Sequence, residues 1–286
     1  MFQAGVSHIY SRSDEIRDIT MRLQGEDEMY ETFARVYDTF MDEVPYDAWA
    51  DCLIREMRKD GIEDGLVLDL GCGTGQITKR LAQAGYDMIG VDASSDMLEI
   101  AQERKGGSDI LYLMQDMREF ELYGTVRCVI STCDSLNYIT NRDDLLQVFR
   151  LVNNYLDPSG LFLFDLNSLR HYEMMCADNT FAESRDECSF IWENSFDAET
   201  RINEYDLTLF LQREDGLYER FLETHRERAW SVNEVEEILT DAGLKPEGAV
   251  SAYVPDTGRM VSTWELDHGC DRVLYRARES GKKRVL

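Results

Sequence analysis

A short segment between residues 67 and 75 carries the residue types with the clearest capacity for chemistry. It reads Val-Leu-Asp-Leu-Gly-Cys-Gly-Thr-Gly and lies where an apolar strand should give way to a helix. Glycines at this spacing let the backbone turn sharply and approach a ligand closely, because they lack a Cβ atom. Asp69 stands just before the first glycine, Gly71, where a carboxylate would repel a pyrophosphate and attract an amino group. The segment therefore predicts a ligand with positive rather than phosphorylated groups.

Two further acidic residues follow at the ends of the next two predicted strands. Asp92 lies about twenty residues after Gly71, where a carboxylate can accept hydrogen bonds from ribose hydroxyls, although it can also cap a helix. Asp116 is either a contact for an adenine amino group or a solvated loop residue, and Met117 could pack on the ring. A dinucleotide fingerprint would want its third glycine where Gln76 stands. The set favours S-adenosylmethionine, which has an amino group and a sulfonium cation and lacks phosphate, over a nicotinamide cofactor.

The loop after the fourth predicted strand, residues 133–138, should face the same site. Ligands of open α/β sheets bind beyond the carboxyl ends of the strands, so this loop would approach the methyl group. Asp134 is a candidate base, a neighbour for the sulfonium or a helix cap, and Tyr138 stacks on a substrate or belongs to the core. Asn167 ends the fifth strand and can line the same pocket, whereas Tyr37 closes over the methionine moiety or packs in the core.

A second group of polar and aromatic residues lies later, between residues 176 and 230. His225 beside Arg226 is the preferred candidate for contacting an acidic or polar acceptor, with a structural histidine as the alternative. Trp192 is a further candidate contact, provided that this segment folds over the pocket. The 4 His of the chain show no metal-ligand spacing, so no metal is expected.

Alternating strands and helices must position these residues. Apolar strands are predicted at 66–70, 88–91, 110–114, 126–131 and 161–166, and helices at 77–84, 95–104 and 143–156, the last closed by a turn at 157–160. A helix capped by Ser231 and two strands at 249–254 and 272–277 follow later. This alternation indicates an α/β fold with a doubly wound, mostly parallel sheet and helices on both faces.

The stretch between those two parts has a different pattern. Residues 189–196, 204–212 and 218–230 alternate apolar and polar side chains with period two, which predicts an antiparallel β meander inserted as a lid. We therefore divide the chain into a polar leader (1–25), a cofactor-binding domain (26–175 and 231–286) and an inserted lobe (176–230). Residues 30–58 predict two helices, with Pro45 near the start of the second.

Composition narrows the function classes. The chain has 56 acidic and 30 basic residues and a formal net charge of −26, which disfavours a nucleic-acid partner because phosphates would be repelled. The 7 Cys form no C-x-x-C pair, which disfavours a disulfide framework. No apolar run approaches the roughly 20 residues that span a bilayer, so we expect a cytoplasmic protein without membrane contact. The oligomeric state stays open, a homodimer included.

Taken together, the motifs resemble those of the class I S-adenosylmethionine-dependent methyltransferases, and the bacterial small-molecule subgroup in particular. The resemblance rests on residues 67–75, 90–94, 115–117 and 133–138. It implies a Rossmann-like sheet of seven strands with a reversed final strand. It also implies that the positions of Asp69 and the glycines contact the methionine end, that of Asp92 the ribose and that of Asp116 the adenine. The full predicted cofactor set is Tyr37, Asp69, Gly71, Cys72, Gly73, Gly75, Asp92, Ala93, Met97, Gln115, Asp116, Met117 and Cys133.

The sequence-based hypothesis is direct transfer of the sulfonium methyl group to a small-molecule acceptor whose nucleophilic atom is nitrogen, oxygen or carbon. Asp134 and His225 are the catalytic candidates, because a base is needed only if the acceptor must lose a proton. The predicted substrate contacts are Asn137, Tyr138, Asn167, Trp192 and Arg226. Methylation of RNA or protein, and a non-catalytic cofactor-binding interaction module, are the alternatives.

Overall fold

The computed structural model describes residues 37, 39–42, 44–213, 215–252 and 262–282 of the 286-residue chain. The predicted leader and most of the first predicted helix lie outside the described residues. None of the described helices is long and apolar enough to cross a membrane.

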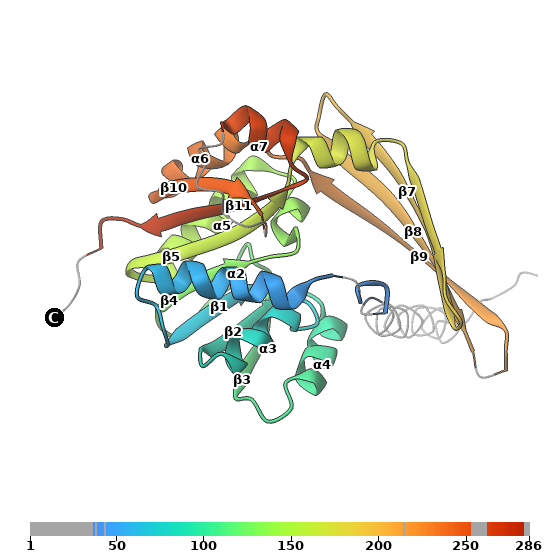
Figure 1. The fold of residues 1–286 in the computed structure, drawn as a ribbon, viewed down its shortest axis with the longest axis horizontal. Helices are drawn as coiled ribbons and strands as arrows, with labels where there is room; N and C mark the ends of the chain where they lie inside the picture. The colour runs from blue at the N-terminus through green and yellow to red at the C-terminus, as the bar shows by residue number, and fades with distance from the viewer. Residues whose placement is uncertain (1–36, 38, 43, 214, 253–261, 283–286) are drawn as a thin grey trace, which may run out of the picture.

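A seven-stranded sheet forms the centre of the molecule (Figure 1). Its strands are β1 (Leu66–Leu70), β2 (Asp87–Asp92), β3 (Ile110–Met114), β4 (Val126–Ser131), β5 (Leu156–Asn167), β10 (Leu244–Ser251) and β11 (Arg272–Glu279), in the spatial order β10-β11-β5-β4-β1-β2-β3. Only β11 runs antiparallel to its neighbours, β5 and β10. The mostly parallel sheet and its reversed final strand are thus confirmed.

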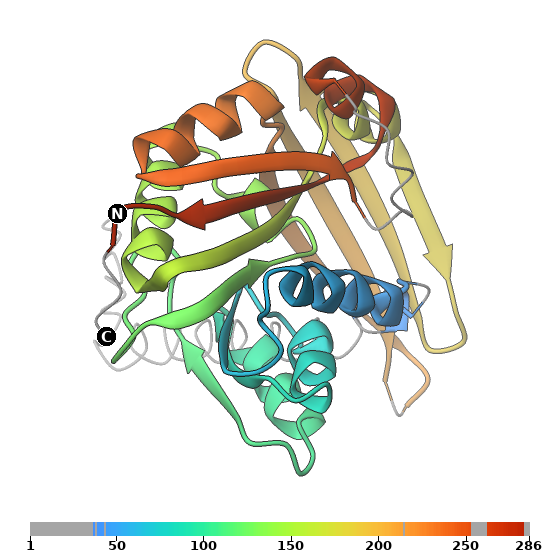
Figure 2. The same ribbon diagram turned by 60° about the vertical axis from the view of Figure 1, so that its left-hand side comes forward.

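Helices cover both faces of this sheet, and each face has its own apolar core (Figure 2). One face carries α2 (Tyr46–Lys59), α3 (Gln76–Gln83) and α4 (Ser95–Arg104), and the other carries α5 (Arg142–Tyr155), α6 (Val232–Asp241) and α7 (Thr263–Gly269). Local signals fix several helix starts: Pro45 precedes α2, and Ser231 forms a capping box with Glu234. The predicted two-faced architecture is confirmed, whereas the short helix α7 was missed.

The inserted meander forms a separate antiparallel sheet at one side of the central sheet (Figure 1). It begins after a short π-helix, η2 (His171–Cys176), and contains β6 (Thr180–Ser184), β7 (Cys188–Asp197), β8 (Ile202–Gln212) and β9 (Tyr218–Arg228). The expectation of three strands was therefore wrong by one. β6 is an edge strand with mostly exposed residues, so its sequence lacks the apolar alternation that marks the others.

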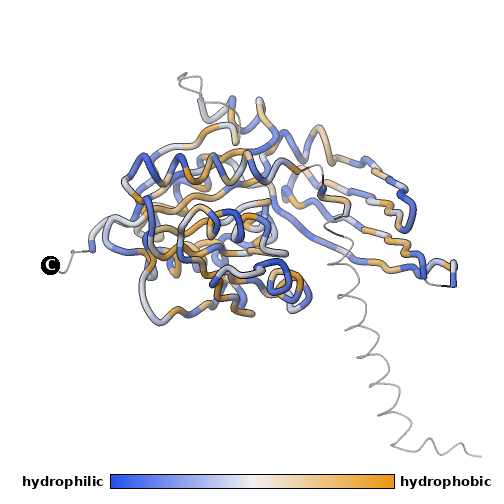
Figure 3. The backbone as a smooth tube through the Cα atoms, turned by 60° about the horizontal axis from the view of Figure 1, so that its bottom comes forward, coloured by the Kyte–Doolittle hydropathy of each residue, from blue (hydrophilic) through white to orange (hydrophobic). Residues whose placement is uncertain are grey.

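Hydrophobic stretches run along the backbone of both the central sheet and the meander (Figure 3). The last strand of the meander ends at Arg228, two residues earlier than expected, because Trp230 is buried in the main core and donates its indole N–H to the carbonyl of Ile139 at 3.2 Å. The meander is thus anchored to the central domain at its exit.

The turn expected at residues 157–160 lies inside β5. Val126 of β4 pairs with Leu156 and Cys128 pairs with Leu161, so the intervening residues of β5 bulge out of the ladder. Ser159 has φ of 66° there, and a Cβ on Gly160 would approach the carbonyl oxygen of Asp157 to 2.9 Å. Residues 157–160 therefore depart from regular strand geometry as expected, but they form a bulge within β5 rather than a turn that precedes it.

We expect Gly90→Ala to lower the free energy of unfolding by about 1–3 kcal/mol, because a Cβ would overpack the strand. In β2 that atom would lie 2.6 Å from the ring of Tyr112 and 2.9 Å from Sγ of Cys72. Urea denaturation followed by circular dichroism measures the change. Gly124→Ala is the matched control, since nothing lies within 4 Å of its added Cβ. Equal effects of the two substitutions would contradict the packing argument.

Candidate active site

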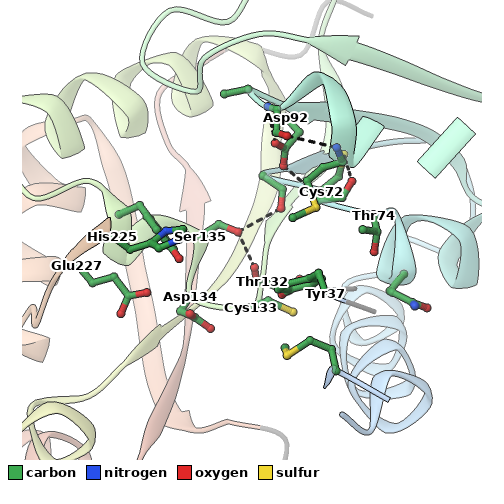
Figure 4. Close-up of a pocket in the computed structure, with 18 of the residues that line it drawn as sticks. Tyr37, Cys72, Thr74, Asp92, Thr132, Cys133, Asp134, Ser135, His225 and Glu227 are labelled. Atoms are coloured by element: carbon green, nitrogen blue, oxygen red, sulfur yellow. Dashed lines mark hydrogen bonds between the residues drawn. The ribbon is translucent and has the colours of Figure 1, made fainter. Parts of the chain in front are cut away.

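A cavity of about 710 Å³ lies between the carboxyl ends of the central strands and one face of the meander. It has a glycine-loop end, which includes Asp69, Gly73, Asp92 and Asp116, and a meander end, which includes Trp192, Tyr205, Glu223, His225 and Glu227. Figure 4 shows Asp92, Cys72 and Thr74 on one side, and Asp134, Glu227 and His225 on the other. The fold thus brings residues from both parts of the chain around one volume.

Most of the residues predicted from the sequence line this cavity. They are Tyr37, Asp69, Gly71, Cys72, Gly73, Asp92, Ala93, Met97, Gln115, Asp116, Met117, Cys133, Asp134, Tyr138, Asn167, Trp192 and His225. Three others, Gly75, Asn137 and Arg226, do not. Placement in the cavity supports a role in binding, and the individual roles remain proposals.

The glycine loop between β1 and α3 needs its glycines for two different reasons. Gly71, Gly73 and Gly75 all have positive φ, at 77°, 52° and 72°. A Cβ on Gly73 would meet nothing within 4 Å, so the open cavity itself lies over this residue. A Cβ on Gly75 would instead lie 2.5 Å from the hydroxyl oxygen of Tyr112. Gly75 is therefore required for packing of the loop against Tyr112, and it is not among the residues that line the cavity, so the structure adds no support to its prediction as a ligand contact.

Asp69 lies at the bottom of the glycine-loop end and is only 1% exposed. Its Oδ2 accepts a hydrogen bond from the hydroxyl of Thr78 at 2.6 Å, whereas its buried Oδ1 has no hydrogen-bond partner among the described residues. Burial raises the pKa of Asp69 to about 7. A buried acceptor without a donor is costly, so the position fits a ligand that brings an amino group.

Asp92 ties the glycine loop to the next helix. One carboxylate oxygen accepts the backbone N–H of Gly73 at 2.7 Å and the other accepts that of Ser94 at 2.9 Å. The side chain of Ser94, rather than that of Asp92, caps α4 by accepting from Met97 at 3.3 Å. Burial raises the pKa of Asp92. The carboxylate is thus held in place by the backbone and borders the cavity.

The loop after β3 forms the outer part of this end. Asp116 accepts the backbone N–H of Arg118 at 2.8 Å and pairs with its guanidinium, and this contact lowers the pKa of Asp116. The side chain of Gln115 closes the same loop by accepting the N–H of Glu121 at 2.7 Å. Met117 lines the cavity beside Gly71, where a Cβ would lie 3.3 Å from Cε of that methionine. A polar rim and an apolar side chain meet here, which suits a purine ring.

The loop after β4 is held in an unusual backbone shape. Cys133 and Asp134 both have left-handed φ, at 59° and 56°, which costs non-glycine residues free energy. Their N–H groups donate to the carboxylate of Asp165 at 3.2 and 2.9 Å. Arg272 then bridges Asp165 at 2.9 Å and Asp134 at 2.6 Å. The bridge fixes the direction of the Asp134 side chain, and sequence reasoning missed it.

The same loop contacts the glycine loop directly. Ser135 donates its hydroxyl to the carbonyl oxygen of Gly71 at 3.1 Å, and a Cβ on Gly71 would lie 2.7 Å from Cβ of Ser135. Asp134 is thus one residue away from a direct contact with the first glycine turn. No sequence pattern predicted this close approach, because the two segments are far apart along the chain.

Aromatic rings form much of the meander end. His225 stacks on Tyr205 with ring centroids 4.7 Å apart, and Tyr138 meets His225 edge-on at 5.8 Å. The hydroxyls of Tyr138 and Tyr205 lie 2.6 Å apart. Trp192 packs against Tyr205 at 5.1 Å. The predicted Tyr138 and Trp192 thus belong to the cavity wall, together with Tyr205, which sequence reasoning did not single out.

Two buried carboxylates of β9 also escaped prediction. Glu223 borders the cavity with 9% of its side chain exposed and lies 3.1 Å from Nε2 of His225. Glu227 accepts a hydrogen bond from Tyr172 at 2.8 Å. Burial, and next the charge of Asp134, raise the pKa of Glu227 to about 8. The period-two spacing of residues 223, 225 and 227 could have revealed them, because alternate residues of a strand share one face.

Two predicted substrate contacts lie elsewhere. Asn137 is fully buried outside the cavity lining: it donates to the carbonyl of Arg228 at 2.8 Å and accepts the N–H of Asn167 at 2.9 Å. Arg226 is exposed on the opposite face of β9 from His225 and pairs with Glu204 at 3.4 Å. The register of β9 thus contradicts the pairing of His225 with Arg226 as one binding unit.

Among the described residues, no group of three or more His, Cys, Asp or Glu could hold a metal ion.

Comparison with known proteins extends over most of the chain. Residues 67–160 match a family model described as a methyltransferase domain. The putative methyltransferase YqeM of Bacillus subtilis (strain 168) is 35% identical over 254 residues, which cover 88% of this chain and 98% of that protein. A crystal structure of an S-adenosylmethionine-dependent methyltransferase from Clostridium acetobutylicum ATCC 824 has a TM-score of 0.76 and 29% identity, covering 88% of this chain and 99% of that one.

A further relative is the dTDP-3-amino-3,4,6-trideoxy-alpha-D-glucopyranose N,N-dimethyltransferase of Streptomyces venezuelae, which is 29% identical over 140 residues. The match covers 48% of this chain and 58% of that protein. The fold and the cavity identify this protein as a class I methyltransferase. The chain belongs to the S-adenosylmethionine-dependent methyltransferases, and S-adenosylmethionine is its cofactor.

We expect Asn137→Ala to lower the free energy of unfolding by about 1–3 kcal/mol, because it leaves buried backbone groups of two segments without partners. Those groups belong to Asn167 and Arg228. Urea denaturation gives the value, and Asn154→Ala, at an exposed position of α5, is the control. If Asn137→Ala unfolded like the control, the bridging role of this side chain would be refuted.

We expect the affinity for S-adenosylhomocysteine to fall by up to about tenfold for each pH unit below 7. A bound ammonium favours the ionised carboxylate of Asp69, so binding is strongest above the pKa of this group and weakens once it is protonated. Calorimetry across this range measures the slope.

In Asp69→Asn the binding should be weaker above neutral pH and its pH slope should flatten. Asp87→Asn, at an exposed position of β2, removes the same charge and should keep the original slope. An undiminished slope in Asp69→Asn would show that another group controls the pH dependence.

Proposed function

We propose that this enzyme transfers the methyl group of S-adenosylmethionine to a small-molecule acceptor enclosed between the glycine loop and the meander. The observation that carries the proposal is the single cavity with two chemically different ends. Its volume, about 710 Å³, lies within the range of pockets that bury small ligands. One end suits the cofactor, and the other leaves room for an acceptor.

The glycine-loop end would hold the cofactor, which supplies an electrophilic methyl group when bound. Asp69 offers its unpartnered Oδ1 to the amino group, and Gly73 leaves the space that the ligand occupies. Asp92 would accept from the ribose, while Met117 packs near the adenine. Asp92 is already aligned by two backbone N–H groups, so little reorganisation accompanies binding.

The meander end would receive the acceptor. Tyr138, Trp192 and Asn167 border it and supply apolar area and hydrogen-bonding groups. Asp134 directly precedes Ser135, which contacts the first glycine turn, and is the candidate group to take a proton near the reacting atoms. His225 lies on the same side of the cavity as Asp134 and is the second candidate (Figure 4). Holding both reactants in this enclosed geometry would supply much of the rate enhancement.

A small molecule is favoured over RNA for two reasons. The net charge of −26 repels a phosphate backbone, and the acceptor region lies inside the cavity rather than on an open basic surface. The Streptomyces venezuelae relative carries the name of an amino-sugar N,N-dimethyltransferase, which is consistent with an acceptor of this size.

We expect a radiolabelled methyl group to pass from S-adenosylmethionine to the low-molecular-weight fraction of a bacterial extract. The extract is divided by ultrafiltration and nuclease or protease digestion, and each fraction is incubated with the enzyme. Asp92→Ala should lose most of this transfer, whereas Asp87→Ala, on an exposed position of the same strand, should retain it. Label that accumulates in protein or RNA instead would refute the small-molecule proposal.

A further inference from the structure

The meander end of the cavity combines buried carboxylates with aromatic rings. Glu223 and Glu227 come from one face of β9, and Asp134 approaches from the loop after β4. Tyr138, Tyr205 and Trp192 provide the rings. Each carboxylate has one partner in the protein, namely His225 for Glu223, Tyr172 for Glu227 and Arg272 for Asp134, so what matters is which of their oxygens remain unsatisfied.

The register of the meander places these groups in successive rows. Trp192, Leu207 and Glu223 face one another across β7, β8 and β9, and Tyr205 and His225 form the next row. Two polar atoms of the first row, Nε1 of Trp192 and Oε1 of Glu223, are buried and have no hydrogen-bond partner among the described residues. A carboxylate oxygen that is both buried and unpartnered calls for a donor from a ligand.

No lysine or arginine among the described residues that line the cavity donates to the unpartnered oxygen of Glu223. Among the described residues that line the cavity, Arg118 is the only lysine or arginine, and it pairs with Asp116 at the glycine-loop end. Arg272 approaches from behind Asp134 and is engaged by Asp134 and Asp165. An acidic acceptor, such as a carboxylate or a phosphate, would therefore meet these carboxylates with no lysine or arginine among the described lining residues of the meander end, where the histidines are His171 and His225.

We propose that the acceptor is a small molecule with a basic amino group, held as an ammonium ion by the carboxylates and rings of the meander end and methylated on nitrogen. This inference rests on the proposed function and specifies its substrate class. Ammonium N–H groups would satisfy Glu223, and aromatic faces attract cations, most strongly that of tryptophan. The carboxylates would hold such a guest near Asp134, which lines the same cavity and directly precedes Ser135, the residue that contacts Gly71.

The chemistry balances with the groups at hand. The ammonium gives one proton to an ionised carboxylate of the cavity wall. Glu227 is the candidate because it lines the cavity and because burial raises its pKa, which makes its ionised form a stronger base than an exposed carboxylate. The nitrogen lone pair then forms the bond to the methyl carbon, and the electron pair of the broken carbon–sulfur bond stays on sulfur. The product nitrogen is again positively charged, and the proton on Glu227 passes to water.

The first test uses the native acceptor through its product. Labelled material from the low-molecular-weight fraction should bind a cation-exchange resin near neutral pH and should survive mild alkali, as methylated amines do. Label that flows through the resin, or that is released as methanol by alkali, would overturn the amine inference. Label in protein or RNA would instead overturn the proposed function itself, so the two failures can be told apart.

The second test measures binding with matched probes. Cyclohexylamine, cyclohexanol and cyclohexanecarboxylate share a ring and differ in the polar group, and ligand-observed NMR follows each of them on protein saturated with S-adenosylhomocysteine. We expect the amine to bind at least about tenfold more tightly than the alcohol, and the carboxylate least. Equal or reversed affinities, or no binding of the amine, would overturn the inference.

Variants assign that preference to the cavity. Glu223→Gln should reduce the amine affinity about tenfold and leave the alcohol unchanged, because only a charged guest needs the carboxylate. Glu193→Gln removes the same charge from an exposed position of β7 in the same sheet and should leave both affinities unchanged. Equal behaviour of the two variants would overturn the role of Glu223, and retained S-adenosylhomocysteine binding shows that each variant is folded.

Discussion

The buried carboxylate of Asp165 is the point on which the arrangement of the site depends. It lies at the end of β5, is fully buried, and accepts from the backbone of Cys133 and Asp134 and from Arg272. A buried charge of this kind is tolerable only when its oxygens are satisfied. Because the three donors come from the loop after β4 and from β11, the same carboxylate joins three strands and holds a strained loop against the glycine turn.

The cavity keeps unsatisfied negative groups at both ends. Asp69 has a buried oxygen without a partner at the glycine-loop end, and Glu223 has one at the meander end. Such groups destabilise the protein that holds no ligand, since their desolvation is not repaid by hydrogen bonds. Two cationic guests would relieve this cost in turn. Binding of a cationic ligand would remove this destabilisation, which adds to its binding free energy. An anionic ligand cannot satisfy these carboxylates and would receive no such contribution.

Sequence reasoning identified the parts of the site that depend on local patterns. The apolar run of β1, the glycine turn and the acidic residues at the ends of β1 and β2 can be predicted because each is a short, continuous pattern tied to one backbone shape. The interaction of Asp134 with Arg272 is not, because it joins residues from opposite ends of the domain and no periodicity encodes it. The wrong prediction that Arg226 contacts the acceptor has a local cause instead. Adjacent residues of a strand point to opposite faces, so its neighbour His225 could line the cavity only if Arg226 did not.

The same alternation makes the meander suited to setting specificity independently of the cofactor. Residues 223, 225 and 227 face the cavity, whereas Arg226 faces outward and pairs with Glu204. A substitution at an inward position would change the charge that meets the proposed acceptor and leave the glycine loop untouched, because the proposed cofactor residues belong to the central domain rather than to the meander. A shift of β9 by one residue would invert the whole face and present Arg226 to the cavity in place of His225. The pairing of β8 with β9, and the anchoring of Trp230 beyond it, therefore determine the acidic character of the meander end of the cavity as much as the residues themselves.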